Sequence, residues 1–223
     1  MPKSTMSTTL NYSPNFDVKK RKVKELKFII FHYTGMKKEN QAITRLTDPK
    51  SKVSSHYLIK NNGEILTLVP DLYVAWHAGV SSWKNYKSIN KYSIGIEISN
   101  PGHEYSYKKF SKKQIKSIIK LSTYLRKKYK IKSNFILGHS DIAPDRKKDP
   151  GEKFPWKYLS KNKIGHWHNL NEKKLFKKRN QIVDKLEKNI FIKNLYKLGY
   201  PKNILFNKYK YSKLLITAFQ RRF

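Results

Sequence analysis

The run Leu26-Lys-Phe-Ile-Ile-Phe-His-Tyr33 is short and nearly continuous in apolar residues, and it ends at Thr34-Gly35. Such a run is typical of a central strand that is buried on both faces of a sheet. The longest apolar stretches of the chain are of this kind, well below the roughly 18 residues of a membrane-spanning helix. The run therefore predicts a domain built around a sheet and excludes a transmembrane protein.

Strands and helices alternate along the rest of the chain. Ser111 and Gln114 form a capping box, and the apolar residues after them have helical spacing up to about Tyr129. Asn61-Asn-Gly63 between two β-rich segments predicts a hairpin. The remaining predicted elements are a helix at 41–46, strands at 53–59, 64–69, 92–99 and 134–137, and helices at about 174–198 and 211–222. The pattern predicts a mixed α/β fold with a central sheet flanked by helices.

The composition divides the chain into three parts. Residues 1–22 are polar and end in Lys19-Lys-Arg-Lys22, which predicts a polar leader with the ordered structure beginning after it. Residues 23–170 hold the predicted α/β domain. Residues 171–223 are heavily charged and helical in pattern, with Gly199-Tyr-Pro201 between two helices, and they predict a small C-terminal helical annex. No secretory signal with about 7 to 15 apolar residues is visible near the N-terminus.

The formal net charge of +34 by itself favours a polyanionic partner, above all nucleic acid. Of the 49 basic residues, however, only seven are arginine, the residue that binds guanine edges and phosphates in bidentate fashion. The 42 lysines are spread over the whole chain, as happens when AT-rich codons shift surface positions toward lysine. Compositional drift is therefore favoured over nucleic-acid binding, and an anionic cell-envelope polymer would be attracted equally well.

Two histidines, His32 and His139, lie at the ends of predicted strands, where side chains emerge into loops. Asp149 follows ten residues after His139, in a loop that prolines and a glycine hold in a fixed course. The chain has no cysteine, so two imidazoles, a carboxylate and a water would form the open four-coordinate pattern of catalytic zinc. A single histidine in a half-apolar strand is more often a hydrogen-bonded core residue, so the pattern alone leaves both interpretations open.

Five separated blocks give these residues their context. They are Phe31-His-Tyr-Thr-Gly35, Val53-Ser-Ser-His-Tyr-Leu-Ile59, Ala75-Trp-His-Ala-Gly-Val-Ser81, Ser93-Ile-Gly-Ile-Glu97, and Gly138-His-Ser-Asp-Ile-Ala-Pro144 followed by Arg146-Lys-Lys-Asp-Pro-Gly151. In this order, and over about residues 26–160, they resemble the zinc-dependent N-acetylmuramoyl-L-alanine amidases of the AmpD and AmiD type. That family shares its fold with phage amidases and peptidoglycan recognition proteins.

The resemblance implies that the two histidines and Asp149 bind one Zn²⁺ per chain, and that Glu97 and Lys147 are catalytic. Glu97, a charged residue at the end of an apolar strand, is suited to take a proton from water and pass it to the leaving amine. Lys147 can place an ammonium group beside the oxyanion of the tetrahedral intermediate. Two alternatives stay open. Glu97 could instead face solvent from the polar side of its strand. Lys148 could lie at the site in place of Lys147, and between these two lysines the family pattern selects Lys147.

Four further residues match family positions in or near the substrate groove, and these are Tyr33, His56, Trp76 and His77. Tyr33 and Trp76, together with Trp83, could stack on sugar faces, although aromatic residues at such positions are at least as often part of the core. His56 suits a core position or one behind the metal ligands, and His77 suits the wall of the groove. The other histidines are expected at the surface: His103, His166 and His168.

The implied activity is hydrolysis of the amide bond between N-acetylmuramic acid, in its ordinary or 1,6-anhydro form, and the L-alanine of the stem peptide. The substrate would be bacterial peptidoglycan or muropeptides, in cell-wall turnover or recycling. Residues 190–223 resemble the start of the peptidoglycan-binding module of AmiD-type enzymes, which usually continues beyond Ala218-Phe-Gln-Arg-Arg-Phe223. A short packing annex without affinity for glycan fits these residues equally well.

Two other functions remain as alternatives. A non-catalytic peptidoglycan-recognition module is opposed by the residue types at the three ligand positions and the two catalytic positions. A basic nucleic-acid-binding protein gives no role to Asp149 or Glu97. The resemblance and the charge favour the cell envelope or periplasm, whereas the lack of a visible signal peptide favours the cytoplasm, and no oligomeric state is predicted.

Overall fold

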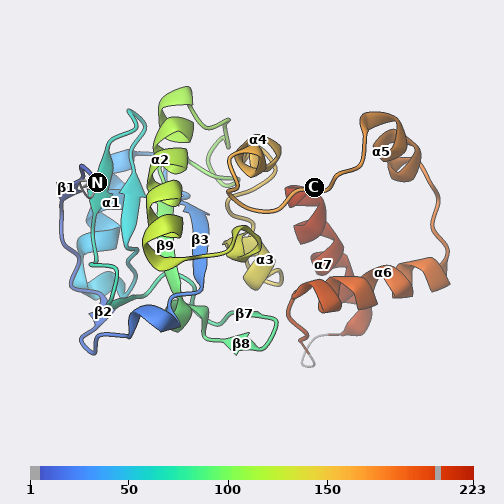
Figure 1. The fold of residues 1–223 in the computed structure, drawn as a ribbon, viewed down its shortest axis with the longest axis horizontal. Coiled ribbons are helices and arrows are strands. Elements are labelled where there is room, and N and C mark those ends of the chain that lie inside the picture. Colours follow the sequence, from blue (N-terminus) through green and yellow to red (C-terminus); the bar gives the residue numbers. More distant parts are fainter. Residues whose placement is uncertain (1–5, 204–206) are drawn as a thin grey trace.

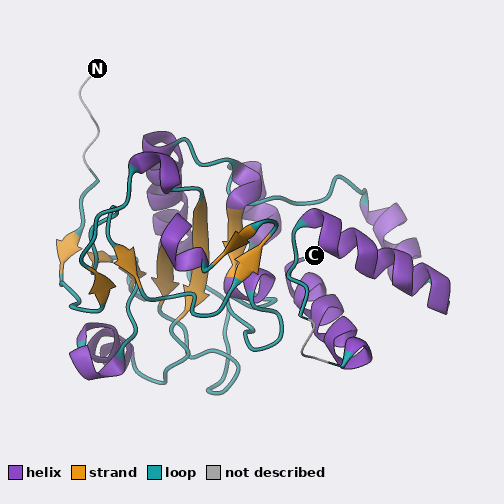
Figure 2. Ribbon diagram, turned by 90° about the horizontal axis from the view of Figure 1, so that it is seen from below, coloured by secondary structure: helices purple, strands orange, loops and turns teal. Residues whose placement is uncertain are grey.

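The structure is a computed structural model that describes residues 6–203 and 207–223. Its centre is a six-stranded sheet in the order β1-β5-β4-β9-β3-β10, with helices on both faces (Figures 1 and 2). The strands of this sheet are β1 (Thr9–Leu10), β3 (Phe28–Tyr33), β4 (Tyr57–Ile59), β5 (Ile65–Thr67), β9 (Ser93–Ile98) and β10 (Ile136–Gly138). All neighbouring pairs are parallel except β4 and β5, which form the predicted hairpin. The predicted mixed α/β fold is confirmed.

Strand β3 lies between β9 and β10, and its apolar run is buried as the sequence predicts. Its side chains alternate between two cores. Ile29 and Phe31 join the core under helix α2 (Lys112–Tyr129), whereas Phe28 and Ile30 join the core under the C-terminal helices. The predicted capping box of Ser111 and Gln114 begins α2. Because β3 is covered on both faces, only its C-terminal end opens to solvent, and this end carries His32.

Shorter elements surround the sheet. Helix α1 (Glu39–Thr47) packs on β4 and β5 through Leu46, and α3 (His139–Ile142) and α4 (Trp156–Lys161) follow β10. Two small antiparallel pairs lie outside the main sheet: β2 (Phe16–Asp17) with β6 (Val74–Ala75), and β7 (Ser82–Trp83) with β8 (Tyr86–Lys87). The segment between β6 and β7 runs past the open end of β3 and contributes to the site described below.

The prediction that ordered structure begins after residue 22 is wrong. Strand β1 pairs with β5 at the edge of the main sheet, and β2 pairs with β6. Between them Asn15 is buried, and its side-chain amide donates to the carbonyl oxygens of Asp48 and Val53. This polar segment is ordered by backbone and amide hydrogen bonds with residues far along the chain, and hydropathy does not report such bonds.

The C-terminal region forms three helices rather than two: α5 (Glu172–Arg179), α6 (Lys185–Leu198) and α7 (Lys208–Arg222). The predicted helix at 174–198 is interrupted because Asp184 accepts a hydrogen bond from the backbone N–H of Glu187 and so begins a new helix. Helices α6 and α7 pack on the sheet domain through Ile192, Leu195 and Leu215, which join the core that contains Phe28 and Ile30.

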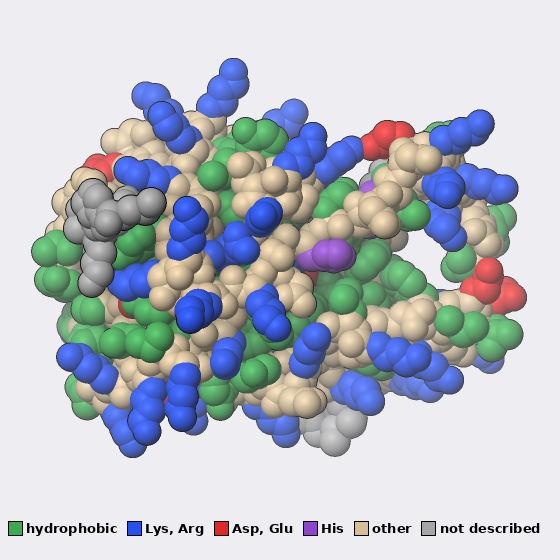
Figure 3. Space-filling view, viewed as in Figure 1, with side chains coloured by type: hydrophobic (Ala, Val, Ile, Leu, Met, Phe, Trp, Pro, Cys, Tyr) green, Lys and Arg blue, Asp and Glu red, His purple; other side chains and the backbone are tan. Residues whose placement is uncertain are grey.

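On the face shown in Figure 3, basic side chains are spread without gathering into one stripe. Figure 3 shows Lys and Arg over both the sheet domain and the C-terminal helices, with few acidic side chains between them. Within the described ranges, no helix is long and apolar enough to cross a membrane. The distribution in Figure 3 matches the even spread of lysine along the sequence.

Candidate metal centre

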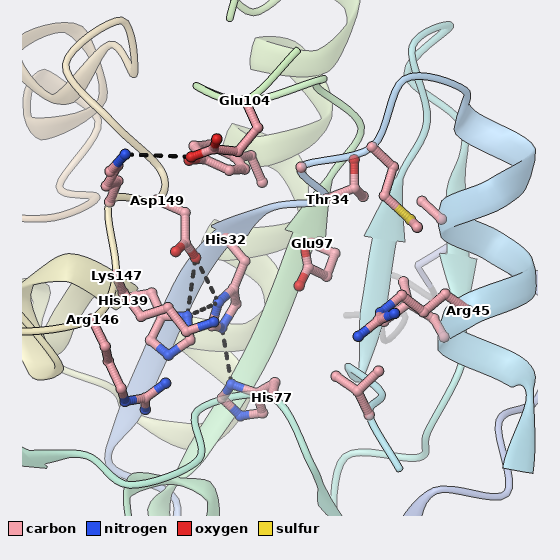
Figure 4. Close-up of a pocket in the computed structure, with 17 residues that line it drawn as sticks. His32, Thr34, Arg45, His77, Glu97, Glu104, His139, Arg146, Lys147 and Asp149 are labelled. Atoms are coloured by element: carbon pink, nitrogen blue, oxygen red, sulfur yellow. Dashed lines mark hydrogen bonds and ion pairs between the residues drawn. The ribbon is translucent and has the colours of Figure 1, made fainter. Parts of the chain in front are cut away.

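The structure brings three predicted ligands together at the open end of β3. His32 lies near the end of β3, His139 begins α3 directly after β10, and Asp149 lies in the loop that follows α3. The Nδ1 atoms of the two histidines are 2.9 Å apart. Asp149 Oδ2 lies 3.0 Å from His32 Nδ1 and 3.1 Å from His139 Nδ1 (Figure 4). All three residues are buried, and one potential ligand atom from each lies within 4.8 Å of the others.

The ionisation of these groups suits a metal cation. Burial lowers the pKa of His32 to about 4, so its imidazole is neutral near pH 7. Burial alone would raise the pKa of Asp149, but His139 and His32 hold it well below its usual range, so this carboxyl is ionised. His139 donates from Nε2 to the carbonyl oxygen of Ala78 at 3.2 Å, and its other nitrogen, Nδ1, faces Asp149. Two imidazoles and one carboxylate form a donor set that fits zinc.

The loop that carries Asp149 is fixed against the start of α3. The backbone N–H of Ser140 donates to the carbonyl oxygen of Asp149 at 2.8 Å, and the Tyr107 hydroxyl donates to the carbonyl oxygen of Pro150 at 2.6 Å. Gly138 permits this approach, because a Cβ atom there would lie 2.5 Å from Pro150 Cδ. The carboxylate is therefore held in place by backbone contacts on both sides.

A cavity of about 460 Å³ opens above the three ligands. Glu97, the register partner of His32 on the neighbouring strand β9, points into it. Burial, reinforced by Asp149, raises the pKa of Glu97 to about 8, although Lys147 opposes this shift. Glu97 Oε2 is buried and has no hydrogen-bond partner among the described residues. A carboxyl group of this kind can hold or release a proton near neutral pH.

The walls of the cavity are rich in cationic groups. Arg45 extends from α1 on one side, and Arg146 and Lys147 lie on the other side (Figure 4). Lys148 also lines the cavity. Both candidate lysines thus line the cavity, but Lys148 Nζ lies 3.4 Å from the exposed carboxylate of Glu104. The hypothesis that Lys147 is the catalytic lysine stays a prediction. Arg45 is not among the predicted site residues, because its place depends on how α1 packs beside the sheet.

The four predicted substrate-binding residues divide into two pairs. Tyr33 and His77 line the cavity. His56 does not, because it is fully buried and its Nδ1 accepts the backbone N–H of Gly95. Trp76 turns away from the cavity and donates its indole N–H to Asp17 Oδ1 at 2.7 Å. Both placements depend on contacts with the N-terminal segment, whose order the sequence analysis missed.

Trp83 takes the core position that the sequence left open, whereas His103 differs from expectation. Trp83 is buried and packs against Tyr200 of the C-terminal region, so it is a core residue. His103, expected at the surface, is half-buried, with its Nδ1 2.8 Å from the Tyr33 hydroxyl and its Nε2 3.0 Å from Glu152 Oε2. His103 therefore supports Tyr33 at the rim of the cavity. His166 is exposed, as expected.

Comparison with known proteins agrees with this geometry. The profile of a family described as N-acetylmuramoyl-L-alanine amidase matches residues 21–152. The chain is 40% identical to the N-acetylmuramoyl-L-alanine amidase AmiD of Escherichia coli over 154 residues, which are 64% of this chain and 55% of that protein. It is 34% identical to the 1,6-anhydro-N-acetylmuramyl-L-alanine amidase AmpD of Haemophilus influenzae over 167 residues, 66% of this chain and 88% of that protein. The chain thus spans little more than half the length of AmiD.

Two solved structures share the fold over most of the chain. The complex of AmiD from E. coli with anhydro-N-acetylmuramic acid-L-Ala-D-gamma-Glu-L-Lys aligns with a TM-score of 0.76 and 32% identity, covering 89% of this chain and 80% of that one. AmpDh3 from Pseudomonas aeruginosa in complex with anhydromuramic pentapeptide aligns with a TM-score of 0.77 and 27% identity, covering 100% of this chain and 88% of that one. The second alignment includes the C-terminal helices as well as the sheet domain.

Proposed function

Because the chain belongs to the N-acetylmuramoyl-L-alanine amidase family, we propose that it hydrolyses the amide bond between N-acetylmuramic acid and the L-alanine of the stem peptide. The observation that carries the proposal is the placement of Glu97 beside the group of His32, His139 and Asp149 in one cavity. A recognition module without catalysis would not need a buried carboxyl group of raised pKa at this position.

The three ligands would hold one Zn²⁺ per chain, with a fourth position left for water. When bound, zinc supplies a Lewis acid that lowers the pKa of water to about 7 and polarises a carbonyl group. The fit rests on the donor atoms themselves, because two imidazole nitrogens and a carboxylate oxygen converge with distances of 2.9 to 3.1 Å between them. The chain contains no cysteine, so no thiolate competes for the ion.

Two side chains would carry the proton and charge movements. Glu97 takes a proton from the attacking water and returns it to the nitrogen of L-alanine as the amide bond breaks. Its raised pKa lets it hold that proton between the two steps. Lys147, which lines the same cavity, places its ammonium group near the oxyanion of the tetrahedral intermediate.

Anhydromuropeptides are the substrate class that we propose. The solved structures of AmiD and AmpDh3 contain an anhydromuramic acid with three or five peptide residues, as their descriptions state. Stem peptides carry free carboxylates, and Arg45 and Arg146 on opposite sides of the cavity suit such groups. The open cavity leaves room for the peptide to extend between them.

The test is metal analysis of the purified protein together with mass spectrometry of a digest of anhydromuropeptides, with and without a chelator. Near-stoichiometric zinc and chelator-sensitive release of intact stem peptides are the expected results. Zinc binding without release would leave a recognition module. Absence of both would overturn the proposal, and the charge of +34 would then direct the search to polyanionic partners.

A further inference from the structure

We propose that His77 and Ser93 act as positioning residues that fix the tautomer of His32, so that its Nδ1 lone pair faces His139 and Asp149. The inference rests on the proposed metal-dependent function of the site. It gives His77 a role different from the one predicted from the sequence, which was contact with substrate. Figure 4 shows His77 beside His32, on the side of that ring away from Asp149.

The series of hydrogen bonds begins at a backbone carbonyl group. Ser93 Oγ lies 2.7 Å from the carbonyl oxygen of Ile89. Two oxygen atoms this close need a hydrogen between them, and only the serine hydroxyl has one to give. With its hydrogen committed to Ile89, Ser93 Oγ can only accept from His77 Nε2, which lies 3.0 Å away. His77 therefore carries its proton on Nε2.

This assignment passes to His32. A neutral imidazole with its proton on Nε2 presents Nδ1 as an acceptor. His77 Nδ1 lies 3.0 Å from His32 Nε2, so His32 donates from Nε2 to His77. The remaining nitrogen of His32, Nδ1, then has no hydrogen, and its lone pair faces His139 Nδ1 and Asp149 Oδ2. A group that hydrogen-bonds to the other nitrogen of a metal-binding imidazole, as His77 does here, sets both the tautomer and the orientation of that ring.

The sheet leaves space for this arrangement at a glycine. Ser93, Gly95 and Glu97 alternate along β9 and share the face that carries His32 on β3. The ring of His77 lies directly over Gly95, because a Cβ atom there would be 2.4 Å from His77 Cγ. One face of a single strand therefore supplies the acceptor for His77, the room for its ring, and the proposed proton carrier.

The residue after His77 orients the second histidine ligand. The carbonyl oxygen of Ala78 accepts the Nε2–H of His139, as described above. Asn90 Oδ1 accepts the backbone N–H groups of His77 and Ala78 at 3.2 and 2.7 Å, which fixes this segment. Two consecutive residues thus set the tautomers of both histidine ligands, one through its side chain and one through its backbone.

The test compares Ser93→Ala and His77→Leu with a matched control, Ser122→Ala. Ser122 is also fully buried, lies in α2 away from the site, and its Oγ has no hydrogen-bond partner within the described part of the chain. Zinc affinity is measured by competition with a chromogenic chelator. We expect the Kd for zinc to rise by about 10- to 100-fold in Ser93→Ala and His77→Leu and to stay unchanged in Ser122→Ala. His77→Gln, whose amide oxygen can still accept from His32, should recover part of the loss.

A second measurement keeps the inference testable independently of catalysis and of variant folding. Long-range ¹⁵N–¹H spectra of the wild-type protein in EDTA report which ring nitrogen of each histidine carries the proton. We expect the Nε2–H form for both His77 and His32. A proton on His32 Nδ1, or zinc affinities of folded Ser93→Ala and His77→Leu equal to that of the control, would overturn the inference. If the wild type neither binds zinc nor cleaves muropeptides, the proposed function fails, whereas the tautomer assignment is still decided by these spectra.

Discussion

Replacement of Glu97 by glutamine should abolish turnover and at the same time stabilise the fold. The amide has the shape of the carboxyl group but cannot carry a proton from water to the leaving amine. We therefore expect kcat to fall by about 10²-fold or more. The gain in stability has a separate cause, because the wild-type carboxyl is buried and its Oε2 has no hydrogen-bond partner among the residues that the structure describes. Folding keeps this group protonated at a pH at which the unfolded chain ionises it.

The size of the effect follows from the pKa of Glu97, which rises from 4.5 to about 8 on folding. A carboxyl whose pKa is raised on folding does not lower the free energy of unfolding below pH 4.5. It lowers that free energy progressively as the pH rises from 4.5 to 8. At about 1.36 kcal/mol per pH unit, the loss at pH 7 would be about 3 kcal/mol. Because Glu97 lines an open cavity that water can enter, we halve this figure to about 1.5 kcal/mol. Glutamine does not titrate, so the variant avoids the loss.

The assay is urea denaturation in EDTA at pH 4.5, 6, 7 and 8, with wild type and Glu97→Gln side by side. The difference in unfolding free energy should be near zero at pH 4.5 and grow to its full value near pH 8. Glu104→Gln is the control, since Glu104 lies at the same cavity but is exposed, and its difference should stay within about 0.5 kcal/mol at every pH. A flat difference for Glu97→Gln, or a variant that still cleaves muropeptides at the wild-type rate, would refute the reasoning.

Three further predictions test other parts of the site and its support. Lys147→Ala should lower kcat by about 10²-fold while Lys148→Ala leaves it within about twofold, as steady-state kinetics with a muropeptide would show; equal losses would contradict the choice of Lys147. Asp149→Ala should purify without zinc by elemental analysis, and retained zinc would remove Asp149 from the ligand set. Arg222→Met leaves the carboxylate of Asp141 buried without its ion-pair partner and should cost about 3 to 5 kcal/mol in urea denaturation, whereas an unchanged midpoint would show that the pair contributes nothing.

The parts of the fold that the sequence predicted correctly are those set by local patterns. The apolar run of β3 and the capping box of α2 each depend on residues within a few positions of one another. Strands β1 and β2 were missed because two-residue strands such as Thr9–Leu10 gain their order from partners more than 50 positions away. Pairing of this kind leaves no periodic signal in a polar segment.

The site shows the same division between local and distant determinants. The ligand positions came from short motifs, and the structure brings all three together. The misplacement of Trp76 in the groove arose because a motif does not tell which side of a turn faces the cavity, whereas His56 lies in the core position that the sequence also allowed. The pattern Ser93-Ile-Gly-Ile-Glu-Ile98 did carry a signal that went unused, since its strict alternation puts Ser93, Gly95 and Glu97 on one face. This alternation predicts that one face of the strand carries small and polar residues beside His32, and not only that the segment is rich in β-branched residues.

The convergence of the proposed ligands follows from the parallel strand order. Strands β9, β3 and β10 are neighbours and run in the same direction, so their C-terminal ends meet at one edge of the sheet. When both rings are neutral and donate from Nε2 to other groups, no hydrogen lies between the two Nδ1 atoms, which are 2.9 Å apart. Facing lone pairs of this kind, next to the buried carboxyl of Glu97, lower the stability of the fold unless a cation satisfies them. Metal binding therefore offsets the destabilisation that these groups cause. The free energy of unfolding should rise with zinc concentration as RT ln(1 + [Zn²⁺]/Kd).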